Sequence, residues 1–237
     1  GRKINSAGDN AAGLAISTRM SSQIRGLDAA IRNANDAVSM VNTAEGALDE
    51  ITTMLQRMRE LAVQAGTGTT AAADRTYLQS EFTALRTEID RIADNTQWNG
   101  RNILDGSAGA STGKSTVAFG IGQDGTAAQT LSTAFGNFNN TTGKLSGLAS
   151  KVITGTTITS AITVAAAAIT EIDVVIADVS AQRASFGAVS NRLTHAVDSL
   201  TNTKTNSEAA RSRVLDTDYA AATSELARTQ IIQQAGT

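Results

Sequence analysis

Two short strings in the middle of the chain contain the glycines that nucleotide-binding loops use. Residues 108–115 read AGASTGKS, a permissive form of the phosphate-binding P-loop, and residues 120–125 read GIGQDG, which fits the dinucleotide fingerprint GxGxxG. The first motif needs a strand before it and a helix after it, and the second needs a surrounding βαβ unit. Here a Gly/Ser-rich stretch precedes the first string and a strand pattern follows it, while the second has the glycines of a hairpin turn. Both are interpreted as loops, and no cofactor is expected.

Titratable side chains do not form a catalytic set either. His195 is the only histidine and the chain has no cysteine, which excludes a site with two histidine ligands, a thiolate metal site and a cysteine nucleophile. The carboxylate pairs Glu88 with Asp90 and Asp216 with Asp218 occur among arginines on predicted helices, so they are interpreted as ion-pair faces. We therefore expect no metal, no catalytic residue and no enzyme activity.

One polar segment, residues 55–65 with the sequence LQRMRELAVQA, is more informative. Helical spacing places Leu55, Met58 and Ala62 on an inner seam. Another face of the same helix then carries Arg57, Glu60, Leu61 and Gln64. An exposed leucine amid charges would be typical of a protein contact, although an ordinary helix surface is an equally good interpretation of the pattern alone.

These residues belong to a long helical pattern that runs from about Asp9 to Ala65 without proline. Apolar or small residues recur at alternating spacings of four and three, and this seam needs cover from other helices. Its members are Met20, Ile24, Leu27, Ile31, Ala34, Val38 and Val41, followed by Ala44, Leu48, Ile51, Leu55, Met58, Ala62 and Ala65. At 1.5 Å per residue the helix would be roughly 80 Å long.

The rest of the chain predicts two further helical segments around a different middle. A second helix is expected over about residues 71–97, folded back on the first, because the intervening GTGTT favours a helix end and a turn. Residues 106–159 are rich in Gly, Ser, Thr and Asn, with strand patterns at 115–121 and near 129–132 that predict a β-hairpin. From about residue 160 the helical period returns, starting at Ile162, and continues nearly to the end.

The predicted class is therefore mainly α. The chain would form a long, antiparallel, coiled-coil-like rod, with residues 1–105 and 160–237 as stalk and residues 106–159 as a β-hairpin and small outer cap. Hydrophobic residues make up 41% but aromatic residues only 3%, which suits thin helices with Ala, Leu, Ile and Val between them. The net charge of −2 and the lack of a basic block argue against nucleic acid, and no apolar run long enough to span a membrane is recognised.

Several long motifs make the sequence resemble bacterial flagellin. In the N-terminal part these are residues 3–16 (KINSAGDNAAGLAI), 23–27 (QIRGL), 32–36 (RNAND) and 43–48 (TAEGAL), followed by the segment 55–65. The C-terminal part contributes 210–219 (ARSRVLDTDY) and 230–236 (QIIQQAG). The chain departs mildly from the family at Gly8 and Asn10, and Trp98 replaces the more common Phe.

This resemblance implies a secreted, extracellular structural protein of the bacterial flagellum, whose subunits pass through the export apparatus, with a chaperone, and polymerise into the filament of motile cells. It also implies that the surface of Arg57, Glu60, Leu61 and Gln64, with Glu81, contacts other subunits and the flagellin-sensing Toll-like receptor of animal hosts. Family members extend beyond both ends of this chain in helices that line the filament. The chain is accordingly expected to be a truncated core fragment that does not polymerise.

Two alternatives remain from the sequence. The Gly/Ser/Thr/Asn-rich cap could make the protein a flagellin-like binding module for a polysaccharide or host glycan, and Lys114, Lys144 and Lys151 would have to cluster if acidic polymers bind there. A hook-filament junction protein shares the terminal patterns.

Overall fold

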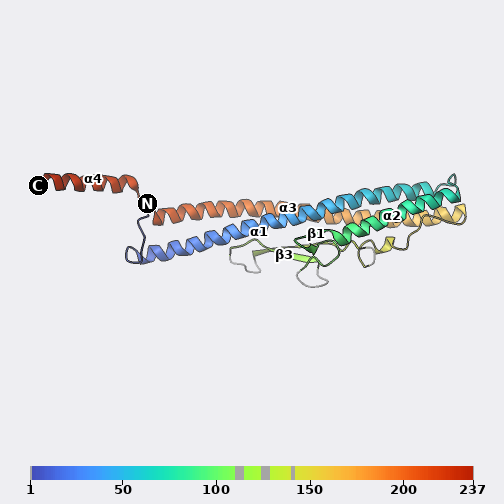
Figure 1. Cartoon of the computed structure of the whole chain (residues 1–237), viewed down its shortest axis with the longest axis horizontal. Helices are drawn as coiled ribbons and strands as arrows, with labels where there is room; N and C mark the ends of the chain where they lie inside the picture. The colour runs from blue at the N-terminus through green and yellow to red at the C-terminus, as the bar shows by residue number, and fades with distance from the viewer. Residues whose placement is uncertain (1, 110–114, 124–128, 140–141, 237) are drawn as a thin grey trace. The chain divides into compact units, whose positions relative to one another are not determined.

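The computed structural model describes residues 2–109, 115–123, 129–139 and 142–236 of the chain. It is mainly helical, which confirms the predicted class, and Figure 1 labels most of its elements. In chain order they are α1 (Ala11–Ala65), α2 (Ala72–Asn95), β1 (Gln97–Trp98), β2 (Arg101–Asn102), β3 (Thr116–Gly120), β4 (Thr130–Ala134), the 3-10 helix η2 (Ser146–Leu148), α3 (Ile158–Leu215) and α4 (Tyr219–Ala235).

The chain forms two compact units, each assembled from segments far apart in the sequence. Unit 1 comprises residues 1–33, 120–129 and 196–237, and unit 2 comprises residues 34–119 and 130–195. Both units therefore combine part of α1 with part of α3. The division into residues 1–105, 106–159 and 160–237 described roles along the stalk, and it stays a prediction.

Unit 2 contains a three-helix core with α2 beside α1 and α3 (Figure 1). Every predicted seam residue of α1 from Ala44 to Ala65 is fully buried there. Phe82 and Ile89 of α2 and Ile172 and Val179 of α3 are buried as well, at the spacing that an amphipathic helix requires. One predicted seam residue is wrong: Ile162 is 46% exposed, because Ala161 and Ala165 occupy the inner positions of that turn.

Side-chain contacts show that α1 and α3 are antiparallel in each unit. In unit 1, Arg211 of α3 donates to Ser21 and Lys204 pairs with Asp28 at 2.7 Å. In unit 2, Arg183 pairs with Asp49 at 2.9 Å and Arg59 with Asp173 at 2.7 Å. Within each unit, a step forward along α1 is matched by an equal step back along α3.

The turn from α1 to α2 is held by a buried arginine. The side chain of Arg75 is 2% exposed, and its guanidinium donates to the carbonyl oxygens of Ala65 at 3.1 Å and Thr67 at 3.2 Å. The last carbonyls of a helix have no partner within the helix, so Arg75 satisfies one of them at the end of α1. It thereby fixes the reversal that brings α2 back along α1.

The small β elements of the middle region are hairpins. The predicted hairpin is confirmed as β3 paired with β4. A second, shorter hairpin pairs Gln97 with Asn102 and Trp98 with Arg101. Between these strands Asn99 has φ 50° and Gly100 has φ 74°, the positive values that a two-residue type I′ turn needs.

Polar side chains define the ends of the long helices. Asn10 caps α1 by accepting the N–H of Gly13 at 2.8 Å, and Asp9 accepts the N–H groups of Asn5 and Ser6. The C-terminal helix is not continuous, because Asp218 accepts the N–H groups of Ala220 and Ala221 and begins α4. An aspartate that caps a new helix stops the previous one, although the apolar period continues across it.

The expectation that no apolar run is long enough to span a membrane is wrong for α3. This helix contains an 18-residue window with a mean hydropathy of 1.8, which passes by length and composition. Only 28% of that window is buried in the structure. The feature is weak evidence for a membrane, since the core helices of other proteins pass the same test. Some apolar side chains of α3, such as Val174, are exposed.

Hydroxyl groups along the helices are used internally. Thr52, Thr87, Thr163 and Thr203 each donate a hydrogen bond to the carbonyl oxygen four residues earlier, and several other serines and threonines do the same. Such bonds let β-branched threonine adopt a helical rotamer without an unpaired donor.

Candidate subunit-contact surface

The charged residues predicted on α1 form a cluster in unit 2 with one residue of α2. The guanidinium of Arg57 donates from Nε to Glu81 at 2.8 Å and from Nη1 to Glu60 at 3.0 Å. The hydrogen bond to Glu81, and then that to Glu60, raise the pKa of Arg57. All three side chains remain accessible, at 50% for Arg57, 68% for Glu60 and 44% for Glu81. The structure thus brings together three of the five predicted residues.

Leu61 is not on this surface, and the expectation that it would be exposed is wrong. Its side chain is fully buried, together with those of Met58 and Ala62. The seam of α1 is wide enough here to include positions 58, 61, 62 and 65, because both α2 and α3 pack against it. The exposed apolar residue of the segment is instead Val63, at 52%.

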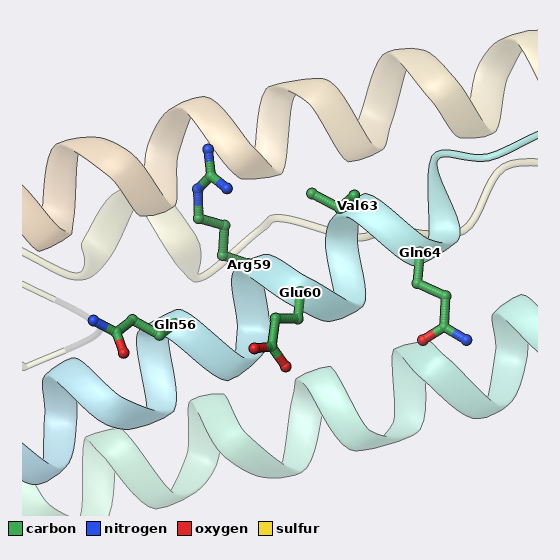
Figure 2. Close-up of a pocket in the computed structure, with 5 residues that line it drawn as sticks. All are labelled: Gln56, Arg59, Glu60, Val63 and Gln64. Atoms are coloured by element: carbon green, nitrogen blue, oxygen red, sulfur yellow. The ribbon is translucent and has the colours of Figure 1, made fainter.

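Val63 lines a hollow of about 580 Å³ on α1, together with Gln56, Arg59, Glu60 and Gln64. Figure 2 shows these five residues along one side of α1, with Arg59 and Val63 extending toward α3 and with Glu60 and Gln64 extending toward α2. Arg59 is anchored by Asp173, and the hydrogen bond to that carboxylate raises its pKa. Around the apolar side chain of Val63, the hollow therefore has one anchored cation, Arg59, the carboxylate of Glu60 and the amides of two glutamines.

The other candidate residues lie apart from this surface. Residues 110–114 of the P-loop-like string, including Lys114, and Gly125 of the GxGxxG string lie outside the described residues. Lys144 and Lys151 are each paired with a carboxylate of α3, Asp178 and Glu171. These two lysines are therefore already engaged within the chain.

The titratable candidates also have structural roles or stand alone. Glu88 forms a two-point ion pair with Arg91, and the hydrogen bond from Arg91 lowers its pKa. Asp218 caps α4, and His195 is exposed on α3. Among the described residues no group of three or more His, Asp or Glu side chains could hold a metal ion.

Comparison with known proteins covers both ends of the chain. Residues 1–109 match the family model of the bacterial flagellin N-terminal helical region, and residues 169–237 match that of the flagellin C-terminal helical region. The chain is 42% identical to a flagellin of Halalkalibacterium halodurans, over 99% of this chain and 81% of the relative. It is 40% identical to flagellin of Bacillus subtilis, over 99% and 83%.

Solved structures agree. The crystal structure of Bacillus cereus flagellin matches 76% of this chain and 94% of its own, with 32% identity and a TM-score of 0.57. A protein of Vibrio parahaemolyticus described as a candidate flagellar hook-associated protein gives a TM-score of 0.72 over 88% of this chain and 100% of its own. Its identity is 13%, so this second likeness shows the fold alone.

Long helices from the two ends of the chain that pair antiparallel, together with matches to both flagellin helical regions, define a structural protein of the flagellar type. The family matches and the full-length identities then decide between its members: the chain belongs to the bacterial flagellin family. It is a structural subunit of the extracellular flagellar filament, assembles with other flagellin subunits and is not an enzyme. The alternatives of a glycan-binding module and of a junction protein are not favoured.

Proposed function

We propose that the surface formed by Arg57, Glu60 and Gln64 of α1 with Glu81 of α2 is where one subunit meets another in the filament. The observation that carries this proposal is the Arg57 cluster itself. Its two ion pairs hold three long side chains in one arrangement before any partner arrives. Preorganised side chains lose less conformational entropy on binding, so a contact made there is less costly.

The neighbouring hollow supports the same role. Val63 gives the surface an exposed apolar point beside the charges, which is the composition of an interface centre with a polar rim. Leu61 supports this surface indirectly. Its buried side chain packs in the core and so fixes the turn of α1 on which Glu60 and Gln64 are exposed. Ile162 and Val174 are exposed on α3, and a partner subunit would cover them.

The test is assembly of charge-reversed and matched variants, made in a subunit that carries the terminal helices through which the family polymerises, because this chain is expected not to polymerise by itself. Arg57→Glu reverses the centre of the cluster and Val63→Asp places a charge in the hollow, and each should raise the concentration needed for filament formation by about tenfold or more. Arg91→Ala removes an arginine with a similar ion pair elsewhere on α2 and should assemble normally. Sedimentation and electron microscopy give the readout, and circular dichroism checks folding. Normal filaments from both surface variants would overturn the proposal.

The same surface would also be read by the flagellin-sensing Toll-like receptor. Arg57 and Glu81 are accessible in the isolated subunit, and a filament contact on this surface would hide them. Folded monomer should therefore activate a receptor reporter cell, and Arg57→Glu should reduce the response while Arg91→Ala leaves it unchanged. No response to folded wild-type monomer would contradict this role.

We infer two further partners, a chaperone from the family resemblance and a surface glycan from the composition of the cap, which would contact other parts of the chain. Helix α4 has no buried residue, and its Leu226, Ile231 and Ile232 are all more than half exposed, which suits a chaperone that covers this segment before export. Residues 106–159 would form the outward cap, the place for any surface glycan contact. Co-elution of a chaperone with wild-type chain but not with Leu226→Asp/Ile231→Asp would support the first role.

A further inference from the structure

A second hollow, separate from the Arg57 surface, lies in unit 2 where α1 meets the β1–β2 hairpin. It measures about 420 Å³ and is lined by Asp36 of α1, Trp98 of β1 and Asn99 of the turn. These residues offer a carboxylate, an indole ring and an amide. A carboxylate attracts a cation, an aromatic face binds it through the ring quadrupole, and an amide oxygen accepts its N–H groups.

The local backbone keeps this set in place. Trp98 is half-buried and paired with Arg101 across the short hairpin, and the type I′ turn fixes the position of Asn99. The guanidinium of Arg101 is directed to the carbonyl oxygen of Ala108, so it does not occupy the hollow. Asp36 is exposed and forms no ion pair with the described residues. The hollow thus has acceptor groups and an aromatic wall but no cation.

Unpaired cations of the matching type occur on α1 in unit 1. Arg25 and Arg32 are both exposed, and neither has an ion-pair partner among the residues that the structure describes. They are seven residues apart, so they lie on one face of the helix. Arg32 also precedes Asp36 by one turn of the same helix, but no ion pair forms between them there, and this order of charges is the less favourable one.

We propose that the hollow of Asp36, Trp98 and Asn99 binds a guanidinium group from Arg25 or Arg32 of a second copy of this chain. The inference rests on assembly of subunits and adds a second contact to the proposed one, at different residues. A guanidinium there would pair with the carboxylate while its flat face stacks on the indole, a geometry that arginine adopts better than lysine. Because Arg25 and Arg32 are two turns apart on one face of α1, either could enter the hollow, depending on how far the partner copy is shifted along the helix axis.

The hollow can first be tested without assembly, because Trp98 is the only tryptophan in the chain and reports on its own surroundings. Acetyl-arginine amide, added to wild-type monomer, should change the Trp98 emission with saturation in the millimolar range. Acetyl-glutamine amide, the neutral control, should not. Asp36→Asn should weaken the response by up to about fivefold. An equal response in Asp36→Asn, or to the glutamine probe, would overturn the assignment.

The copy-to-copy contact is tested by mixing two charge-reversed variants, made in the same subunit with terminal helices as the Arg57 variants. Asp36→Arg alone should meet the partner's arginines with like charge, and Arg25→Asp/Arg32→Asp alone should meet the partner's Asp36 with like charge. Each should need about fivefold more protein to assemble than wild type. An equimolar mixture restores opposite charges at both kinds of contact and should assemble at close to the wild-type concentration.

The outcomes separate this inference from the proposed Arg57 contact. Normal assembly of both charge-reversed variants, or a mixture that assembles no better than its components, would overturn the second contact while leaving Arg57→Glu as an independent test. Arg19→Asp, a reversal on another face of α1, is the matched control and should assemble as wild type does.

Discussion

The two units use the same pair of long helices but bury very different amounts of apolar surface. In unit 2, α1 and α3 are joined by α2, and large side chains such as Phe82, Phe135 and Phe186 are fully buried, with the rings of Phe135 and Phe186 5.1 Å apart. In unit 1 the well-buried side chains are smaller and fewer, among them Ile24 and Leu27, and α4 buries none. The presence of α2 as a third helix therefore determines how much of the apolar seam is buried.

This difference indicates which unit supports itself. Burial contributes roughly 25 cal/mol per Å² of apolar surface, so unit 2 has the larger driving force to fold alone. Unit 1 leaves Leu226, Ile231 and Ile232 exposed to water, so it has the smaller driving force. Stability thus follows the number of helices in contact rather than the length of any one.

The largest expected effect comes from one change made in each unit on the same helix. Leu48→Ala removes a fully buried side chain in unit 2 and should lower the free energy of unfolding by about 3–5 kcal/mol. Leu27→Ala, in unit 1, should lower it by only about 2 kcal/mol because the sparser surroundings can collapse. Urea denaturation followed by circular dichroism measures both. Equal losses would break the comparison.

A smaller effect should separate two glycines of α1. A Cβ at Gly46, in unit 2, would meet no atom within 4 Å, so Gly46→Ala should stabilise the helix by about 0.5–1 kcal/mol. A Cβ at Gly26, in unit 1, would lie 2.8 Å from the backbone oxygen of Gln123. Gly26→Ala should therefore destabilise by about 1 kcal/mol through displacement of the loop. Thermal unfolding gives the sign, and stabilisation by both would contradict the loop contact.

The smallest effect concerns pH and is confined to unit 1. Hydrogen bonds from the backbone N–H groups of Asn5 and Ser6 lower the pKa of Asp9. A carboxylate with a lowered pKa contributes stability above its ordinary value of 3.8, and that contribution is lost as the pH falls through the lowered value. The protection factors of the Asn5 and Ser6 amides in hydrogen exchange should therefore fall in acid. Asp9→Asn should remove this pH dependence, and an unchanged profile in that variant would refute the role.

Much of the fold could be predicted because it depends on periodicity. The seam from Ala44 to Ala65 and the ends of α2 followed from spacing, turn residues and the lack of proline. The break before α4 was missed because the apolar period continues through Asp216 and Asp218, and only the capping bonds of Asp218 reveal it. Ile162 was assigned to the buried face because the apolar pattern of one helix does not show how much of its circumference the neighbouring helices cover.

The surface residues were harder to predict than the core. Arg57 and Glu60 could be paired from their spacing on one helix, but Glu81 joins them only because the turn held by Arg75 fixes how α2 returns. Leu61 was assigned to the wrong face because burial there depends on two partner helices, and sequence spacing describes one. The hollow of Asp36 and Trp98 combines residues far apart in the chain, which no local pattern indicates.

The threonine and serine hydroxyls that donate back into their own helices have a consequence for polymerisation. A surface whose hydroxyl hydrogens are already engaged holds fewer water molecules by donation, so less hydration has to be stripped when another copy covers it. The outer face of α3 combines hydroxyls that already have acceptors with exposed apolar side chains such as Val174, and both lose little hydration when another copy covers them. This combination suits a polymer that grows one subunit at a time.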